Sequence, residues 1–188
     1  MTTITKLNSP TKVMVALMVV VSAFSVAARA AEQPTPVSPV TVTFVEPQKF
    51  TDVKEDWSSD SVANDRYRDF VLSELKAYLQ KMAAPYFTEG RKLEVKITDI
   101  DLAGDFEPWR GHGFDDVRIV KDLYPPRMTV EFAVVGADGR VMREGSRKLM
   151  DMSFLMTTSM PSHDTLRYEK EMLRSWLRQE FKPVAPKA

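Results

Sequence analysis

The chain has 188 residues, no cysteine and two histidines, and its 26 basic and 26 acidic side chains leave no formal net charge. The lack of cysteine excludes disulfides and thiolate zinc sites, and two histidines cannot form a three-histidine metal centre. Because the composition provides no net basic surface, it argues against nonspecific nucleic-acid binding, and we expect no nucleic-acid partner. The length suits one domain with a sizeable core.

The first thirty residues have the pattern of a secretory signal peptide. Lys6 and Lys12 precede an apolar stretch over 13–28, and Ala28-Arg29-Ala30 provides a small–x–small cleavage motif. An uncleaved anchor is the alternative, but a spanning helix needs roughly 20 apolar residues, more than this stretch has. There is no twin arginine. We therefore expect the general secretory route, cleavage after Ala30, a periplasmic or secreted protein, and no membrane span after cleavage. Cleavage would remove Lys6, Lys12 and Arg29, so the mature chain would have 23 basic against 26 acidic side chains.

Proline marks the expected boundaries of the folded domain. Residues 31–39 hold three prolines and predict an extended linker, because proline fixes φ and lacks an amide donor. Residues 182–188 predict a disordered tail. Residues 40–181 are therefore expected to form a single α+β domain.

Hydrophobic periodicity predicts the first elements of this domain. Apolar residues alternate over 40–44 and again over 93–97, as in two strands. Between them a helix is expected to begin at Asp60 or Ser61, either of which can cap it, and to end near Ala84. The apolar residues of this helix, at spacings of three and four, are Tyr67, Val71, Leu75, Tyr78 and Met82.

The alternation breaks after the second predicted strand. Asp99 and Asp101 fall on the parity of the apolar residues 93, 95 and 97, whereas Ile100 and Leu102 fall on the other parity. Either a bulge turns the strand over here, or two carboxylates point at the core. The pattern alone leaves both alternatives open.

The second half of the domain predicts a hairpin and a helix. An exposed loop over 104–115 and a short strand over 117–120 precede a clear strand over 128–134. An Asp-Gly turn over 137–140 leads back into 141–150, whose polar middle is typical of an edge strand protected by charge.

A final helix is expected after a cap at Ser162 or Asp164, with a buried stripe that includes Leu166, Leu173 and Leu177, flanked by Trp176. Both helices have one apolar face and should cover the same face of the sheet. The predicted fold is therefore α+β, a mostly antiparallel sheet of about four to five strands with two helices packed on one face.

The common catalytic signatures are missing, and the polar segment 98–127 carries the remaining candidates. Asp99, Asp101, Asp105 and Glu107 occupy positions one, three, seven and nine of a calcium loop. Alanine stands at position five, and Arg110 stands at position twelve, where a bidentate glutamate is required. We therefore expect no metal and no cofactor, and keep the four carboxylates as weak metal candidates.

A catalytic interpretation uses the same acids. Asp99 and Asp101 share one strand face and lie about 6–7 Å apart by strand rise, and paired carboxylates can act as acid and base. With Asp105 they are the weak catalytic candidates. The favoured alternative is that the pair accepts hydrogen bonds from Arg118 or Arg127 on neighbouring strands. Whether the protein is an enzyme stays open, and we favour that it is not.

A third interpretation is recognition, because aromatic side chains alternate with cations in this segment. Tryptophan, tyrosine and arginine are enriched at binding hot spots. Trp109 either points outward from a glycine-flanked loop or folds back to plug the end of the sheet, and both alternatives stay open. The binding candidates are Trp109, Arg110, Arg118, Tyr124 and Arg127.

Two other groups of residues have weaker signals. Met150, Met152, Met156 and Met160 could in principle hold copper through their thioethers, but methionine is a common gap filler, and we favour core packing. The two histidines, His112 and His163, are expected on solvent-facing loops without a role.

Several segments together resemble one known family. They are 42–45 (VTFV), 105–110 (DFEPWR), 116–119 (DVRI), 121–127 (KDLYPPR), 144–145 (EG) and 166–170 (LRYEK). As a set they resemble bacterial secreted proteins grouped as domain of unknown function 3016, and the likeness covers most of 40–181. This resemblance implies an exported bacterial protein with a single domain, and brings no activity with it.

The function expected from the sequence is a non-enzymatic binding or envelope-associated module. Its partner would be a protein or small molecule of the cell envelope. The alternative is a carboxylate-dependent hydrolase, with or without calcium.

Overall fold

The computed structural model describes residues 38–54, 61–111, 117–157, 161 and 163–181. The chain divides into Met1–Thr35 and Pro36–Ala188, and the described residues all belong to the second unit. Among them, no helix combines the length and apolar character needed to cross a membrane. Several predictions lie outside the described residues: the signal peptide, the linker up to residue 37, Asp60, His112, Met160, Ser162 and the tail.

Four strands form the main sheet in the order β1-β2-β5-β6. The strands are β1 (Val40–Phe44), β2 (Lys92–Asp101), β5 (Arg127–Val135) and β6 (Val141–Met150). Two of the three pairings are antiparallel, so the predicted mostly antiparallel sheet is confirmed. The exception is the β1–β2 pair, which is parallel because a helix connects these two strands and returns the chain to the same end of the sheet.

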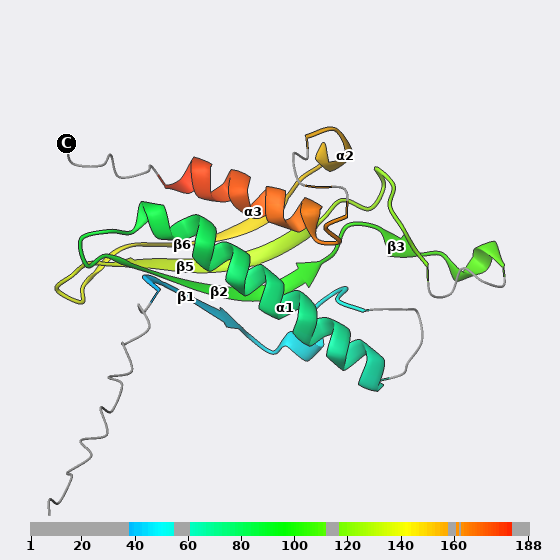
Figure 1. The fold of residues 1–188 in the computed structure, drawn as a ribbon, viewed down its shortest axis with the longest axis horizontal. Helices are drawn as coiled ribbons and strands as arrows, with labels where there is room; N and C mark the ends of the chain where they lie inside the picture. Colours follow the sequence, from blue (N-terminus) through cyan, green and yellow to red (C-terminus); the bar gives the residue numbers. More distant parts are fainter. Residues whose placement is uncertain (1–37, 55–60, 112–116, 158–160, 162, 182–188) are drawn as a thin grey trace, which may run out of the picture. The chain divides into compact units, whose positions relative to one another are not determined.

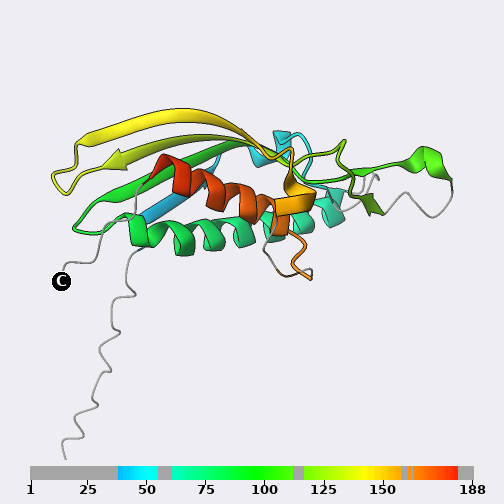
Figure 2. The ribbon, with the colours of Figure 1, turned by 90° about the horizontal axis from the view of Figure 1, so that it is seen from above.

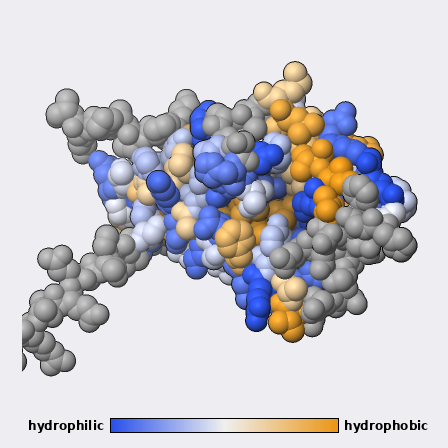
Figure 3. Space-filling model, turned by 45° about the vertical axis from the view of Figure 1, so that its right-hand side comes forward, coloured by the Kyte–Doolittle hydropathy of each residue, from blue (hydrophilic) through white to orange (hydrophobic). Residues whose placement is uncertain are grey.

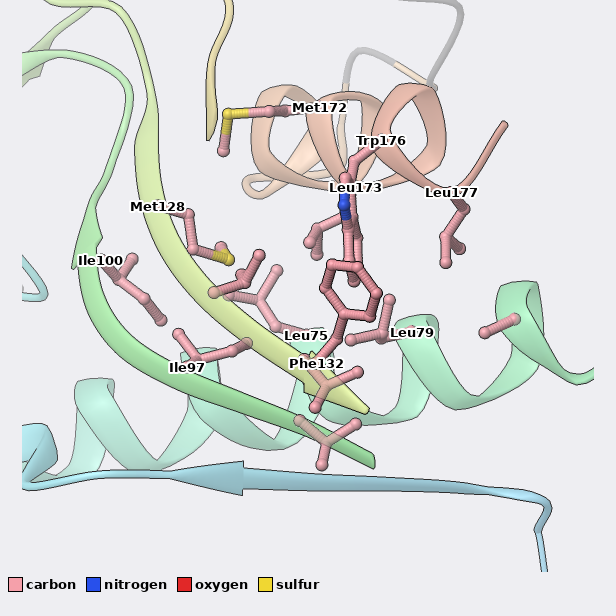
Figure 4. Close-up of a cluster of buried hydrophobic side chains, with 14 of the residues drawn as sticks. Leu75, Leu79, Ile97, Ile100, Met128, Phe132, Met172, Leu173, Trp176 and Leu177 are labelled. Atoms are coloured by element: carbon pink, nitrogen blue, oxygen red, sulfur yellow. The ribbon is translucent and has the colours of Figure 1, made fainter. Parts of the chain in front are cut away.

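Two long helices cover one face of this sheet, as expected (Figures 1 and 2). The helix α1 (Ser61–Ala83) follows β1, and α3 (Arg167–Glu180) closes the domain. Leucines of α1 meet Leu173, Trp176 and Leu177 of α3 over the apolar side chains of β2 and β5 (Figure 4). The buried face of α1 differs from the predicted stripe, because Tyr67, Tyr78 and Met82 are only partly buried, while Leu72, Leu79 and Ala83 are buried.

A bulge in β2 resolves the break in alternation. The pairing with β5 shifts register between Ile97 and Asp99, so the core-facing parity changes from odd to even residues. Ile97 and Ile100 are both fully buried, and the carboxylate of Asp99 turns away from the core. The bulge therefore places both Asp99 and Asp101 on the face opposite the helices.

A second, two-stranded sheet joins the segment predicted as an exposed loop to the short strand expected over 117–120, which is confirmed. It pairs β3 (Asp105–Phe106) with β4 (Arg118–Ile119), and the short 3-10 helix η3 (Pro108–Arg110) follows β3. The exposed-loop prediction was wrong at Phe106 and Glu107, which are buried. We call the described residues 104–111 and 117–124 the arm, because β3 and the turn after it extend beyond the end of the main sheet (Figures 1 and 2).

The remaining elements are short and connect the larger ones. They are the 3-10 helices η1 (Pro47–Lys49) and η2 (Ala84–Tyr86) and the helical turn α2 (Phe154–Thr157). Core packing was the wrong prediction for the methionines around α2, because Met150, Met152 and Met156 are all exposed. The apolar anchor of this segment is instead Phe154, which packs against Tyr168 of α3.

Candidate functional site

Asp99 and Asp101, at the end of β2, each have a separate partner. Asp99 accepts hydrogen bonds from the backbone N–H and the Oγ1 of Thr51, at 2.8 and 2.9 Å. Asp101 accepts a hydrogen bond from Nη1 of Arg127 on β5, at 2.9 Å. The two carboxylates thus share one strand face without sharing a proton or a common donor. Burial raises the pKa of Asp101, against the lowering effect of Arg127.

Arg118 joins the arm to the segment that follows β1. Two of its nitrogens donate to the carboxylate of Asp52, at 2.6 and 3.1 Å, and it also donates to the carbonyls of Gly104 and Lys54. Its guanidinium carbon lies 4.6 Å from the centre of the Phe106 ring. Although burial disfavours the cation, the hydrogen bonds to Asp52 raise the pKa of Arg118. The donors of this arginine are therefore used within the protein.

Glu107 is the central acceptor of the arm. Its side chain is almost fully buried and accepts hydrogen bonds from Lys121 Nζ at 2.5 and 2.8 Å and from the Tyr124 hydroxyl at 2.9 Å. Arg110 donates to the same carboxylate. The Lys121 hydrogen bond, with those of Tyr124 and Arg110, lowers the pKa of Glu107 to about 2. The hydrogen bond that the Tyr124 hydroxyl donates to Glu107 raises the pKa of Tyr124.

Trp109 has the opposite environment, although it lies only two residues from Glu107. It belongs to η3, and 70% of its surface is exposed. Of the two alternatives for this residue, the structure has the outward-facing one. Other apolar side chains are exposed at this end of the domain, among them Leu123 of the arm, and Figure 3 shows hydrophobic residues gathered beside strongly hydrophilic ones.

A pocket of about 290 Å³ lies where the arm meets the end of the main sheet. Its charged and hydrogen-bonding side chains are Thr51, Asp52, Lys54, Asp101, Asp105, Tyr124 and Arg127. Two catalytic candidates and two binding candidates of the sequence thus line one pocket. Asp99, Glu107, Trp109, Arg110 and Arg118 do not line it.

The four metal candidates do not converge on one point. Asp99 and Asp101 face Thr51 and Arg127, and Asp105 Oδ1 accepts the backbone N–H of Phe106 at 2.7 Å. Glu107 accepts from three cationic or hydroxyl donors. In the part of the chain that the structure describes, no group of three or more acidic, histidine or cysteine side chains is arranged to hold a metal ion.

Two acids with partners distant in the sequence were missed: Asp52, which is partly buried, and Glu169, which is fully buried. Asp52 has no sequence signal, because its partner Arg118 is 66 residues away. Glu169 had one: it lies three residues after Leu166 and four before Leu173, which places it on the apolar face of α3. Glu169 Oε1 accepts the backbone N–H of Ala103 at 2.7 Å, Oε2 has no hydrogen-bond partner among the described residues, and burial raises the pKa of this carboxyl.

These features define a class of protein: an α+β domain with a mixed four-stranded sheet, two helices on one face, and a polar cluster that holds an arm at one end. The chain belongs to a family described as protein of unknown function (DUF3016), whose model matches residues 38–179. The predicted family is thereby confirmed. No match was found among curated proteins, and none among solved structures.

Proposed function

We propose that the protein is an exported, non-enzymatic binding module of the cell envelope, and that the arm presents its partner-binding surface around Trp109. The observation that carries the proposal is that Trp109 is exposed on its turn, while Glu107, two residues before it, is buried and held by hydrogen bonds. An indole in water leaves a large apolar surface unburied, and such surfaces mark interaction sites when they are grouped.

The hydrogen bonds beneath the turn favour binding because they order it in advance. Arg110 donates to Glu107, and Lys121 and Tyr124 hold the same carboxylate from the other side of the arm. A turn that is already ordered loses less conformational entropy when a partner binds. Tryptophan and arginine are also among the residue types enriched at interface hot spots.

The other binding candidates support this surface without forming it. Arg118 is engaged by Asp52, and Arg127 by Asp101. The Tyr124 hydroxyl donates to Glu107. We therefore assign the contact itself to Trp109, and the positioning of the arm to Arg118 and Tyr124.

The test is the substitution Trp109→Ala in the exported protein. Envelope partners would be crosslinked in place and identified by mass spectrometry, and the affinity of the purified partner would then be measured for both proteins. We expect Kd to rise at least tenfold, which corresponds to about 1.4 kcal/mol, because hot-spot tryptophans contribute more than 1 kcal/mol on truncation. Arg110→Ala is a poorer test, since it would also loosen the hydrogen bonding of Glu107.

Met142→Ala provides a matched control. Met142 is 64% exposed, comparable to Trp109, and belongs to β6, away from the arm. Both variants should keep the wild-type melting temperature, because neither side chain is part of the core. An unchanged Kd for Trp109→Ala, or a large drop in its melting temperature, would contradict the assignment of Trp109 as the contact.

A carboxylate-dependent hydrolase is the second candidate, and one observation favours it. Asp101 and Asp105 line the same pocket, and burial raises the pKa of Asp101, as a general acid requires. Chromogenic esters, phosphate esters and glycosides would be tested with the wild type and with Asp101→Asn. Turnover that disappears in the variant would establish this function, and equal background rates in both would remove it.

A further inference from the structure

A groove between β6 and α3 is separate from the arm and its pocket. It has a volume of about 710 Å³, within the range of ligand-binding clefts. Its apolar part includes Met172 and Trp176 of α3, and its cationic part includes Arg143, Arg147 and Lys148 of β6. Nothing in the proposed function of the arm uses this groove.

The outer edge of β6 borders the groove and is free to pair. β6 has ten residues and is the last strand of the main sheet, and no other strand pairs with its outer edge among the described residues. An unpaired edge presents backbone N–H and C=O groups that an extended peptide can use as a template. The opposite edge strand β1 has five residues, and Gln80 of α1 donates to the carbonyl of its Val40.

Two arginines replace apolar residues on the helix-facing side of β6. Arg143 and Arg147 pair with Val134 and Val130 of β5, both of which are buried. Both arginines donate to one carboxylate, that of Glu180, so a positive charge remains uncompensated between them. Inward-pointing charges on an edge strand discourage pairing with an apolar strand, and here they favour one that carries acidic side chains.

The lining of the groove as a whole also has more positive than negative side chains. Lys148 forms no ion pair with the described residues, and Asp151 is the second acid of the lining after Glu180. Three bases therefore face two acids. Trp176 is 4% exposed, and its Nε1–H, which can only donate, has no acceptor among the described residues. A partner strand bound along the groove would bring main-chain carbonyl oxygens, which are hydrogen-bond acceptors, to the region of this N–H group.

We propose that the groove receives an extended segment of a partner protein that carries acidic side chains. The segment adds to the outer edge of β6 as a fifth strand. Acidic side chains on the helix-facing side of the segment lie opposite Arg143 and Arg147, and apolar side chains on that side contact Met172 and Trp176. An acidic side chain on its other side lies opposite Lys148. Main-chain hydrogen bonds then provide affinity, and the charges select the sequence.

The probe is a synthetic peptide of about eight residues, a length typical of strands. Glutamate and valine alternate on one face of the peptide, and glutamate and threonine alternate on the other. It would be titrated into ¹⁵N-labelled protein comprising residues 31–188. We expect the backbone amides of β6 to shift and to gain protection from hydrogen exchange. The indole N–H signal of Trp176 should move, and that of Trp109 should stay in place. This difference separates the groove from the arm.

Two peptide controls and one pair of protein variants test whether charge and main-chain hydrogen bonds account for the binding. Replacing glutamate by glutamine in the peptide should weaken binding at least about tenfold, and N-methylation of alternate peptide amides should abolish it. Lys148→Glu should weaken binding at least about threefold. Arg140→Glu, the same charge change on the exposed hairpin turn, should leave Kd within about 1.5-fold of wild type.

Three results would overturn the proposal. The first is no shift in β6 at millimolar peptide. The second is equal binding of the glutamate and glutamine peptides. The third is protection of β6 that rises with protein concentration alone, together with dimers in sedimentation, because the occupant would then be a second copy of this chain. Failure of this proposal leaves the Trp109 test of the arm unaffected.

Discussion

Glu107 and Trp109 show how two neighbouring side chains can have opposite roles. Glu107 is buried because three donors from the arm satisfy its carboxylate, which removes the penalty of an unpaired buried charge. Trp109 is exposed because the turn of η3 directs it away from that cluster. The acid therefore determines the position of the aromatic residue, although only the aromatic residue is available to a partner.

The depressed pKa of Glu107 predicts a pH-dependent contribution to stability. The pKa is about 2 in the folded protein against an ordinary value of 4.5, so the ionised carboxylate stabilises the folded state. This contribution is complete above about pH 4.5 and is lost as the pH falls toward 2. Glu107→Gln should therefore unfold more easily than wild type at pH 7, with the difference shrinking toward pH 2. Urea unfolding between these pH values measures it.

Glu94→Gln is the control for this experiment, because Glu94 is an exposed acid on β2. Its difference from wild type should stay small across the same pH range. A constant difference between Glu107→Gln and wild type from pH 7 down to pH 2 would contradict the assigned role of the Glu107 carboxylate.

At the scale of elements, the arm depends on a close approach of two backbones. Gly104 follows the end of β2 with φ at +85°, and its N–H donates to the carbonyl of Tyr124 at 3.0 Å. A Cβ at this position would lie 2.9 Å from the carbonyl oxygen of Ile119. Both the left-handed φ and the missing side chain are therefore required where the arm leaves the sheet.

Gly104→Ala should lower the free energy of unfolding by about 1–2 kcal/mol for the left-handed backbone and by a further 1–3 kcal/mol for the contact. Gly139→Ala separates these two effects, because Gly139 has a similar φ of +80° and no atom within 4 Å of the added Cβ. Chemical unfolding of both variants gives the comparison. Equal losses in the two variants would show that the contact with Ile119 costs nothing.

The elements that could be predicted from the sequence are those with a clear apolar period. The strands at 40–44, 93–97 and 128–134 and both long helices are found where the periodicity predicts them. The strand β4 lies within the short strand predicted over 117–120, but β3 and its pairing with β4 could not be predicted, because β3 has two residues and no periodicity. The methionines of 150–156 were predicted as core from residue type alone, and residue type does not determine burial at the end of a sheet.

At the scale of the whole molecule, export is the remaining prediction. We expect the exported chain to begin at Ala31, since Ala28-Arg29-Ala30 matches the small–x–small cleavage pattern. Intact mass spectrometry of the protein released from the producing cells would test this directly. Ala30→Leu should block cleavage and leave the precursor in the membrane. A released chain that retains residues 1–30 would contradict the prediction.

The sequence by itself determined the local structure of this protein and the family to which it belongs. Periodicity defines strands and helices because burial of one face is a local pattern. The tertiary structure decided everything that depends on distant partners: the parallel β1–β2 pair, the bulge after Ile97, and the pairing of Arg118 with Asp52. It also decided that Trp109 faces outward while Glu107 is buried. The physical reason is that charge pairing and exposure depend on which segments meet in space, and this is set by the packing of the whole domain.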